Sequence, residues 1–137
     1  DLSSNDVFKG KNIVLFSLPG AFTPTCSTSH LPRYEELYEE FKQQGVDAVV
    51  CLSVNDAFVM GAWGADQKVG DSVVMLADGS AACSDEVGLG LDLVAAGLGK
   101  RGQRFAMIVD DGTVSHLAVE EGGAFEVSSA EAIMAAL

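Results

Sequence analysis

Basic residues are scarce in this sequence, which has 8 Lys and Arg against 20 Asp and Glu and a formal net charge of −12. Nucleic acids and anionic membrane surfaces both attract proteins through Lys and Arg side chains, so this net negative charge argues against either as a partner. No apolar run approaches the roughly 20 residues that a membrane-spanning helix needs. A basic start followed by an apolar stretch is also missing, so we expect no secretion signal.

Paired cysteines are missing as well. Cys26, Cys51 and Cys83 are widely spaced and form no C-x-x-C pair, and neither of the two histidines lies at a zinc-finger spacing from a cysteine pair. This pattern disfavours a disulfide scaffold and a structural zinc site, and we expect no metal and no cofactor. Free thiols fit a reducing compartment, which predicts a cytoplasmic protein. The chain begins with Asp1 rather than Met, so a plastid location stays open if a transit peptide has been removed.

The length of 137 residues and the apolar content of 48% favour one globular domain over residues 1–137. Continuous apolar runs predict strands buried on both faces of a sheet. Apolar positions three and four apart predict helices. The expected strands are residues 12–18, 46–54, 73–76, 105–109 and 114–119, and the expected helices are residues 31–41, a segment through Phe58 and Trp63, and a short helix after a Ser128–Glu131 capping box.

The order of these elements predicts an α/β, thioredoxin-like fold, with a mixed central sheet and helices on both faces. Pro32 is expected to kink the first helix or to loosen its first turns, and Gly45 to end it. Asn55 or Asp56 is expected to cap the second helix. The region 81–102 is rich in glycine and weakly patterned, and it predicts no regular element.

The stretch around Cys26 favours a reactive thiol. With Thr23 as the N-cap and Pro24 as the first helical residue, Cys26 lies in the first turn of a helix. Its sulfur then faces unpaired backbone N–H groups and the positive end of the helix dipole, which stabilise a thiolate. The hydroxyls of Thr23 and Thr25 can donate to the sulfur or to a bound oxyanion. A buried structural cysteine remains the alternative on this local pattern.

The stretch from Pro19 to Cys26 also carries a family motif. It reads P-G-A-F-T-P-T-C and reproduces the P-x-x-x-T-x-x-C signature of peroxiredoxins. Nearly the whole chain resembles the peroxiredoxin-five branch, which includes the plant type-II enzymes and the peroxiredoxin domain of bacterial peroxiredoxin–glutaredoxin hybrids. The other matching stretches are VNDAFVMGAW (54–63), DGSAA (78–82), LGLDL (89–93), RFAMIVDDG (104–112) and GGAFEVSSAE (122–131).

The resemblance implies a thiol-dependent peroxidase that reduces hydrogen peroxide and alkyl hydroperoxides. Cys26 would be the peroxidatic cysteine, whose thiolate attacks the peroxide and becomes a sulfenic acid. Thr23 would bind the peroxide through its hydroxyl, and Pro19 would shield the thiolate from solvent. Arg104 would hold the thiolate and stabilise the charge that builds on the peroxide oxygens.

Three other aromatic or imidazole side chains have more than one interpretation. Phe22 and Trp63 are candidates for an apolar substrate rim, and a place in the core or an interface is the alternative. His30 lies one helical turn after Cys26, where it can tune the thiol or make a structural hydrogen bond near Pro32.

The sequence suggests two routes for resolving the sulfenic acid. Cys51 matches the second cysteine of the plant type-II enzymes, but it lies in an apolar strand and we expect it to be buried. The other route is an external thiol, either glutathione with glutaredoxin or thioredoxin. Cys83 lies in a glycine- and alanine-rich stretch, and we interpret it as incidental.

The family resemblance leaves further expectations. Family members commonly form homodimers. They also have an N-terminal strand pair that is apparently missing here, because only about a dozen residues precede the first expected strand. The alternative function is a thiol redox sensor, relay or holdase that uses the same Cys26.

Overall fold

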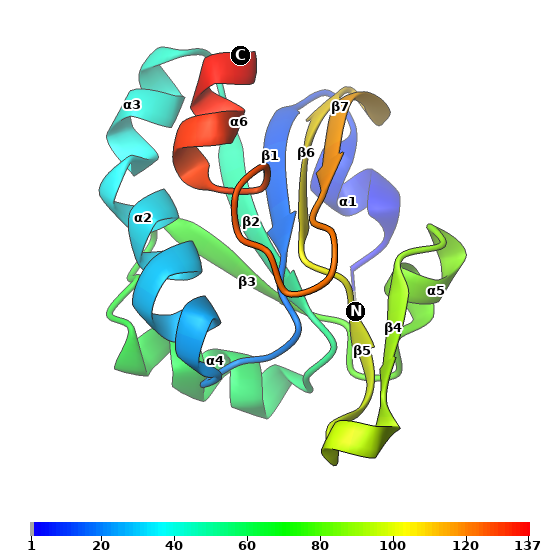
Figure 1. The fold of residues 1–137 in the computed structure, drawn as a ribbon. Coiled ribbons are helices and arrows are strands. Elements are labelled where there is room, and N and C mark those ends of the chain that lie inside the picture. Colours follow the sequence, from blue (N-terminus) through cyan, green and yellow to red (C-terminus); the bar gives the residue numbers. More distant parts are fainter. Residues whose placement is uncertain (1) are drawn as a thin grey trace.

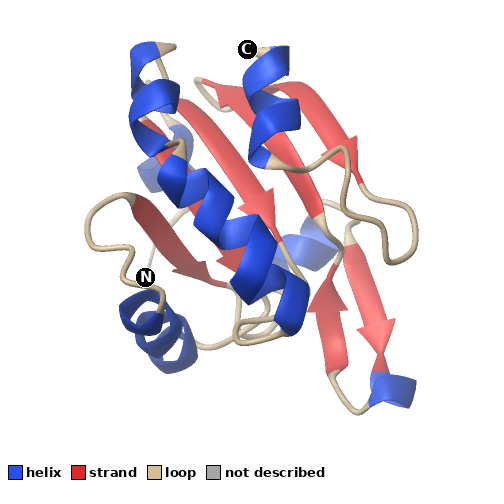
Figure 2. Ribbon diagram, turned by 60° about the vertical axis from the view of Figure 1, so that its left-hand side comes forward, coloured by secondary structure: helices blue, strands red, loops and turns tan. Residues whose placement is uncertain are grey.

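The computed structural model describes residues 2–137, and Figures 1 and 2 show their arrangement. Five strands form one sheet in the order β3-β2-β1-β6-β7, and β4 and β5 form a separate two-stranded arm. The strands are β1 (Asn12–Ser17), β2 (Ala48–Ser53), β3 (Val73–Ala77), β4 (Gly90–Leu93), β5 (Gly99–Gly102), β6 (Phe105–Asp110) and β7 (Thr113–Val119). The helices are α1 (Ser4–Phe8), α2 (Leu31–Glu36), α3 (Tyr38–Gln43), α4 (Ala57–Asp66), α5 (Ala82–Glu86) and α6 (Ala130–Ala136), with a π-helical turn η1 (Cys26–His30) and a 3-10 turn η2 (Val94–Ala96).

The central strands confirm the predicted mixed sheet. β1 pairs parallel with β2 and antiparallel with β6, and β2 pairs parallel with β3. In β1 and β2, every residue after the first is buried, as their continuous apolar runs predict. Parallel neighbours need crossover helices, which the η1–α2–α3 segment and α4 supply. The fold is therefore the thioredoxin-like α/β fold expected from the sequence.

Helices cover both faces of the sheet, and each face has its own hydrophobic cluster. Residues of α2, α3, α4 and α6 pack on one face with alternate residues of β1 and β2. The other face packs against Val7 and Phe8 of α1. Figure 2 shows the larger helices in front of the sheet and the smaller ones behind it. The larger face contains a column of stacked rings, with 4.0 Å between the centroids of Phe16 and Tyr34 and 5.7 Å between those of Tyr34 and Phe41.

The predicted helix over residues 31–41 is present, but its main irregularity lies elsewhere than expected. Pro32 lies in the first turn of α2 and does not kink it, and the backbone instead breaks at Leu37, between α2 and α3. The kink is therefore absent, because a first-turn proline is compatible with a helix. The alternative, loosened first turns, agrees with the wider π-helical turn η1 just before Pro32. Gly45, with φ of +89°, follows the end of α3 as predicted.

The capping residues agree with the sequence for α4 but not for α6. Asp56 caps α4, since its carboxylate accepts the N–H of Val59 at 2.8 Å. Ser129 caps α6 by accepting the N–H of Ala132, so the capping box predicted from Ser128 is wrong by one residue. The Ser128 hydroxyl is committed to a different acceptor, which is described with the site below.

Several short elements lie where the sequence shows no recognisable pattern. α5, β4, η2 and β5 fall in the region 81–102, and α1 precedes β1. These elements have three to five residues, which is too short for a helical or strand period to be recognised.

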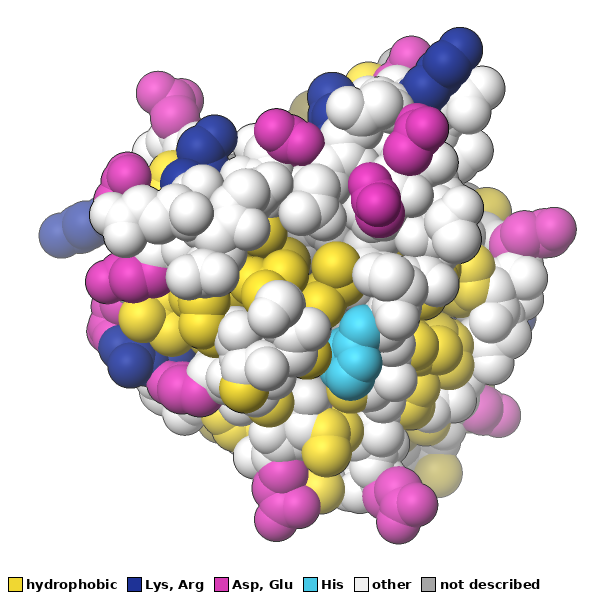
Figure 3. Space-filling view, turned by 90° about the horizontal axis from the view of Figure 1, so that it is seen from above, with side chains coloured by type: hydrophobic (Ala, Val, Ile, Leu, Met, Phe, Trp, Pro, Cys, Tyr) yellow, Lys and Arg dark blue, Asp and Glu magenta, His cyan; other side chains and the backbone are white. Residues whose placement is uncertain are grey.

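Within the described part of the chain, no helix is long and apolar enough to cross a membrane. Figure 3 shows acidic side chains spread around the face seen from above, in keeping with the net charge of −12.

Candidate active site

Cys26 is the first residue of η1, on the connection that leaves the carboxyl end of β1. Helical structure starts at Pro24, so Cys26 lies in a first turn as predicted. The turn is a π-helix, because the N–H of Leu31 donates to the carbonyl of Cys26, five residues earlier. The cysteine is only 1% exposed, so its sulfur lies beneath the molecular surface.

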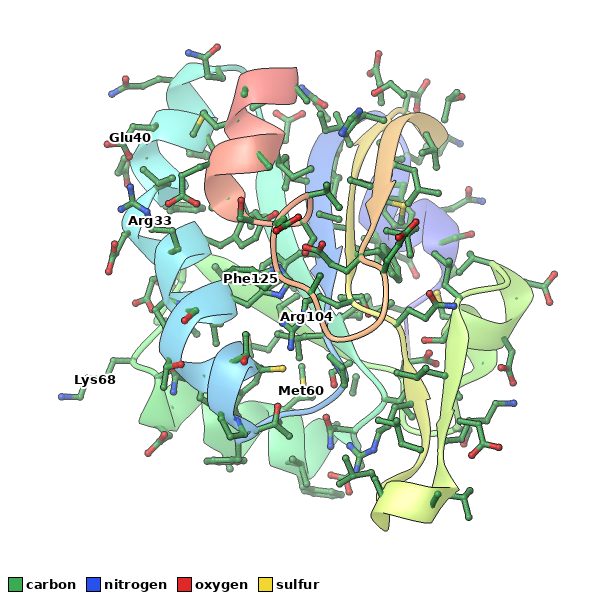
Figure 4. The ribbon with its side chains drawn as sticks, viewed as in Figure 1. Arg33, Glu40, Met60, Lys68, Arg104 and Phe125 are labelled. Carbon is green, nitrogen blue, oxygen red and sulfur yellow. The ribbon has the colours of Figure 1, made fainter. Side chains whose placement is uncertain are left out.

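Arg104 brings a positive charge directly to this sulfur. It comes just before β6, and its Nη2 donates to the Sγ of Cys26 at 3.1 Å. Its guanidinium also lies 5.7 Å from the ring centroid of Phe125, a cation–π distance. Figure 4 shows Arg104 and Phe125 together at the loop between β7 and α6. The structure therefore joins the two residues that the sequence proposed, although 78 positions separate them.

His30 holds the other side of the guanidinium. Nη1 of Arg104 lies 2.7 Å from Nδ1 of His30, and Nε2 of His30 lies 3.0 Å from the carbonyl oxygen of Ser128. A guanidinium can only donate, so Nδ1 accepts and Nε2 carries the proton. Burial and the adjacent Arg104 charge lower the pKa of His30 to about 3. His30 is therefore neutral at physiological pH. It makes a structural hydrogen bond, but to Ser128 on the β7–α6 loop rather than near Pro32, and tuning of the thiol stays a prediction.

The loop that supplies the Ser128 carbonyl is organised by Glu120, which the sequence analysis missed. The Glu120 carboxylate accepts the backbone N–H groups of Glu126, Val127 and Ser128 at 2.7, 3.2 and 2.9 Å, and the Ser128 hydroxyl at 2.6 Å. Burial alone would raise the pKa of Glu120, but these hydrogen bonds outweigh burial and lower it. Nothing in the local pattern around Glu120 distinguishes it from the exposed Glu121.

Thr23 lies immediately before the helix, but its hydroxyl does not cap it. Its Oγ1 donates to the carbonyl of Gly20 at 2.7 Å. The expectation that this hydroxyl donates to the sulfur or to an oxyanion is therefore wrong for this conformation, because its only proton is already committed. Its lone pairs remain able to accept a hydrogen bond. Pro19, between β1 and Gly20, is partly buried.

The loop before Thr23 is held in a specific shape. Asn55 accepts the N–H of Ala21 at 3.0 Å and the hydroxyl of Ser53 at 2.7 Å, which ties the loop to the end of β2. Phe22 has a φ of +64°, in the left-handed region that a residue with a bulky side chain rarely adopts. A Cβ at Gly20 would lie 3.2 Å from the Thr23 methyl group, so this position favours glycine.

The two aromatic candidates for the rim differ in exposure. Phe22 is 54% exposed, whereas Trp63 is fully buried. Their ring centroids are 6.4 Å apart, and the Trp63 indole N–H donates to the Ser27 hydroxyl at 3.1 Å. Only Phe22 presents surface to solvent, and Trp63 supports it and the start of η1 from the core.

The other two cysteines have different environments. Cys51 of β2 is completely buried, as predicted, and it pairs with Phe16 across the sheet. Burial raises its pKa well above the usual value, and the nearby Cys26 sulfur raises it further. A thiol must ionise to attack, so Cys51 is unreactive in this conformation. Cys83, at the start of α5, is exposed.

The chemistry available at this site is nucleophilic. A thiolate at Cys26 is stabilised by the Arg104 guanidinium, and the same group can donate to negative charge developing on a bound molecule. Across residues 2–137, no cluster of three or more His, Cys, Asp or Glu side chains is arranged to hold a metal ion.

Three comparisons place the chain among known proteins. A family model described as Redoxin matches residues 1–134. Peroxiredoxin-2B of Arabidopsis thaliana is 49% identical over 135 residues, which cover 98% of this chain and 83% of the plant protein. Hybrid peroxiredoxin hyPrx5 of Haemophilus influenzae is 42% identical over 98% of this chain and 56% of its own length. A crystal structure of reduced Prx3 in complex with hydrogen peroxide, from Vibrio vulnificus, is similar with a TM-score of 0.92 and 51% identity, over 96% of this chain and 82% of that one.

Proposed function

Because this chain belongs to the redoxin family and is a peroxiredoxin, a thiol-dependent peroxidase, we propose that Cys26 is the residue that reacts with the peroxide. The resemblance stated from the sequence is thereby confirmed at the level of the family. The observation that carries the assignment of Cys26 is its 3.1 Å contact with Arg104, which is the contact a reactive thiolate requires.

The first step is a displacement at oxygen. The Cys26 thiolate attacks the terminal oxygen of a hydroperoxide ROOH, an S–O bond forms, and the O–O bond breaks. The products are the Cys26 sulfenic acid and RO⁻. The leaving RO⁻ takes up one proton from water, equal in number to the proton that the thiol released. With hydrogen peroxide the second product is water, and with an alkyl hydroperoxide it is an alcohol.

Arg104 and Thr23 have complementary roles in this step. The guanidinium donates both to the sulfur and to the peroxide oxygens, where negative charge builds as the O–O bond breaks. The Thr23 hydroxyl donates to Gly20, so it accepts the O–H of the peroxide and orients it for attack. Pro19 and the surrounding loop restrict solvent, and the exposed Phe22 lines the apolar rim that alkyl hydroperoxides cross.

An external thiol then reduces the sulfenic acid. Glutathione attacks the Cys26 sulfur, a mixed disulfide forms and water leaves. A second thiol, from glutaredoxin, attacks the mixed disulfide and regenerates Cys26. Thioredoxin is the alternative reductant, and Cys51 the alternative resolving cysteine. The burial of Cys51 disfavours it, because burial raises the pKa of this thiol and a thiol must ionise to attack.

Steady-state peroxide consumption tests this function. The wild type is compared with Cys26→Ser, Cys51→Ser and the matched control Cys83→Ser, with glutathione plus glutaredoxin and separately with thioredoxin. We expect Cys26→Ser to be inactive and both other variants to turn over with glutathione plus glutaredoxin. Activity in Cys26→Ser would refute the assignment of Cys26, and loss of activity in a folded Cys51→Ser would make Cys51 the resolving cysteine.

Two further expectations belong to this proposal. The chain acts as a homodimer in a reducing compartment, either cytoplasm or plastid stroma, where its three free cysteines stay reduced. A thiol sensor or holdase would use the same Cys26, but none of the relatives described above favours that function.

A further inference from the structure

The side chain and the backbone of Arg104 belong to one closed circuit of hydrogen bonds. Nη1 of its side chain donates a hydrogen bond to Nδ1 of His30, and Nε2 of His30 donates to the Ser128 carbonyl. The Glu120 carboxylate binds the loop that ends at Ser128. The backbone N–H of Glu120 donates to the carbonyl of Arg104 itself at 2.9 Å, which closes the circuit.

From this circuit we propose that Glu120 is a positioning residue for Arg104, acting through the Ser128 carbonyl and the tautomer of His30. The proposal rests on the proposed role of Cys26, because Arg104 matters to the reaction through that sulfur. The hydrogen bonds of the Glu120 carboxylate go to residues 126–128 and not to the Cys26 sulfur. Its effect is to fix where one carbonyl oxygen points.

The Glu120 carboxylate, through its hydrogen bonds to the loop, holds the Ser128 carbonyl in place. This carbonyl accepts two hydrogen bonds, from Nε2 of His30 at 3.0 Å and from the Tyr34 hydroxyl at 2.7 Å. Each donor sits on the helical segment that begins at Cys26, whereas the carbonyl sits on the β7–α6 loop. Four hydrogen bonds to the Glu120 carboxylate hold that loop, and Glu120 itself is only 7% exposed. The loop has no regular secondary structure that would hold it otherwise.

The tautomer of His30 transmits this position to Arg104. While the Ser128 carbonyl accepts from Nε2–H, Nδ1 has a lone pair that faces the guanidinium. If the carbonyl moves away, the proton is free to shift to Nδ1. An Nδ1–H group would face an N–H of Arg104, donor against donor, and the guanidinium would leave its place beside Cys26.

Two substitutions separate this positional role from a role of the negative charge. Glu120→Gln loses the charge but can place its amide oxygen where Oε2 accepts three of the four hydrogen bonds. Glu120→Asp keeps the charge, but its carboxylate is one methylene shorter and cannot reach the same donors. A positioning role therefore predicts that Gln retains more activity than Asp, and an electrostatic role predicts the reverse order.

The experiment measures kcat/KM for hydrogen peroxide together with the ¹⁵N chemical shifts of the His30 ring, in a His116→Gln background so that only one imidazole is observed. Glu121→Ala is the matched control, since Glu121 is the exposed neighbour. We expect Glu120→Gln to stay within about threefold of wild type and Glu120→Asp to fall by about tenfold, which corresponds to about 1.4 kcal/mol. We also expect the ring shifts of Glu120→Asp, but not of Glu120→Gln, to show mixed tautomers.

The proposal is overturned if Glu120→Asp equals or exceeds Glu120→Gln in activity, or if its rate falls while the His30 tautomer is unchanged. Glu120→Ala is a third variant, expected to resemble Asp, and circular dichroism establishes that each variant is folded. Cys26→Ser is assayed in parallel. Activity in that variant refutes the role of Cys26, a failure distinct from that of Glu120.

Discussion

Arg104 contacts Cys26 and His30 through two different nitrogens of one guanidinium group, at 3.1 and 2.7 Å. The planar group spans a sulfur that carries negative charge when ionised and an imidazole nitrogen that only accepts. A shift of either neighbour moves the guanidinium and so alters its contact with the other. The predictions below follow from this relationship and from the burial around it.

Arg104→Lys should reduce kcat/KM for hydrogen peroxide by about 100- to 1,000-fold, a range typical of losing a donor to developing oxyanion charge. An ammonium group keeps the charge, but it is a compact point charge and cannot bridge both neighbours with the geometry of the fork. Stopped-flow peroxide reduction measures the effect, and Arg33→Lys, at a surface arginine paired with Glu36 and Glu131, is the control. A loss of less than threefold would show that charge alone is sufficient at this position.

Thr23→Ser and Thr23→Val should differ sharply. Serine keeps a hydroxyl that can donate to the Gly20 carbonyl and accept from the peroxide, whereas valine has a similar shape and no hydroxyl. We expect Ser within about threefold of wild type and Val lower by about 10- to 100-fold in kcat/KM, because the peroxide loses its orientation. Equal rates for the two variants would mean that the hydroxyl does not touch the substrate.

Cys51 should be unreactive until the fold opens. A count of accessible thiols with a chromogenic disulfide reagent should find Cys83 reacting in the native protein and Cys51 reacting only in denaturant, since Cys51 is fully buried and Cys83 is exposed. Cys51→Ser should leave the native thiol count unchanged, and Cys83→Ser should lower it by one. Rapid native labelling of Cys51 would mean that β2 becomes accessible far more readily than its burial indicates.

His30 should make the fold sensitive to mild acid. Its folded-state pKa of about 3 lies below the unfolded value of 6.5, so between these pH values the unfolded chain binds a proton that the folded chain does not. Its contribution therefore lowers the free energy of unfolding by about 1.4 kcal/mol per pH unit as pH falls from 6.5 toward 3. Above pH 6.5 this contribution is constant.

Urea denaturation of the wild type and of His30→Gln from pH 7 to pH 4 measures this slope. His116→Gln is the control for losing a histidine without losing the buried one. The free energy of unfolding should fall less steeply with acid in His30→Gln, by about 1.4 kcal/mol per pH unit. In His116→Gln it should fall as steeply as in the wild type. Parallel curves for all three proteins would show that His30 titrates normally in the fold.

Much of the architecture could be predicted from the sequence because its signals are local and long enough to repeat. The buried strands β1 and β2 have continuous apolar runs, and α4 begins after a capping aspartate. The short elements of the β4–β5 arm have no such period. Whether residues 1–137 form one complete domain, and whether a strand pair is missing, remain predictions.

The residues of the site likewise divide into those that a local motif identifies and those that depend on the folded chain. Cys26 and Thr23 lie in a contiguous motif, and Arg104 could be proposed only because the family motif names an arginine at that place. Glu120 was missed because its importance comes from a loop that folds back onto it six to eight residues later. No pattern in the sequence states that a particular acidic side chain will point inward, since that depends on the path of the backbone around it.

Because Cys26 begins a π-helical turn, the direction of its side chain depends on the number of residues in that turn. The Leu31 N–H reaches back five residues to the Cys26 carbonyl, so this turn holds one residue more than an α-helix would. If the same residues formed an ordinary α-helical turn instead, Cys26 would be rotated relative to α2 by about 100°, the angle that each residue adds to an α-helix. The sulfur would then point away from Arg104 although every residue of the motif was still present. Homologous chains are therefore best compared here by the number of residues between Cys26 and Pro32, as well as by their identity.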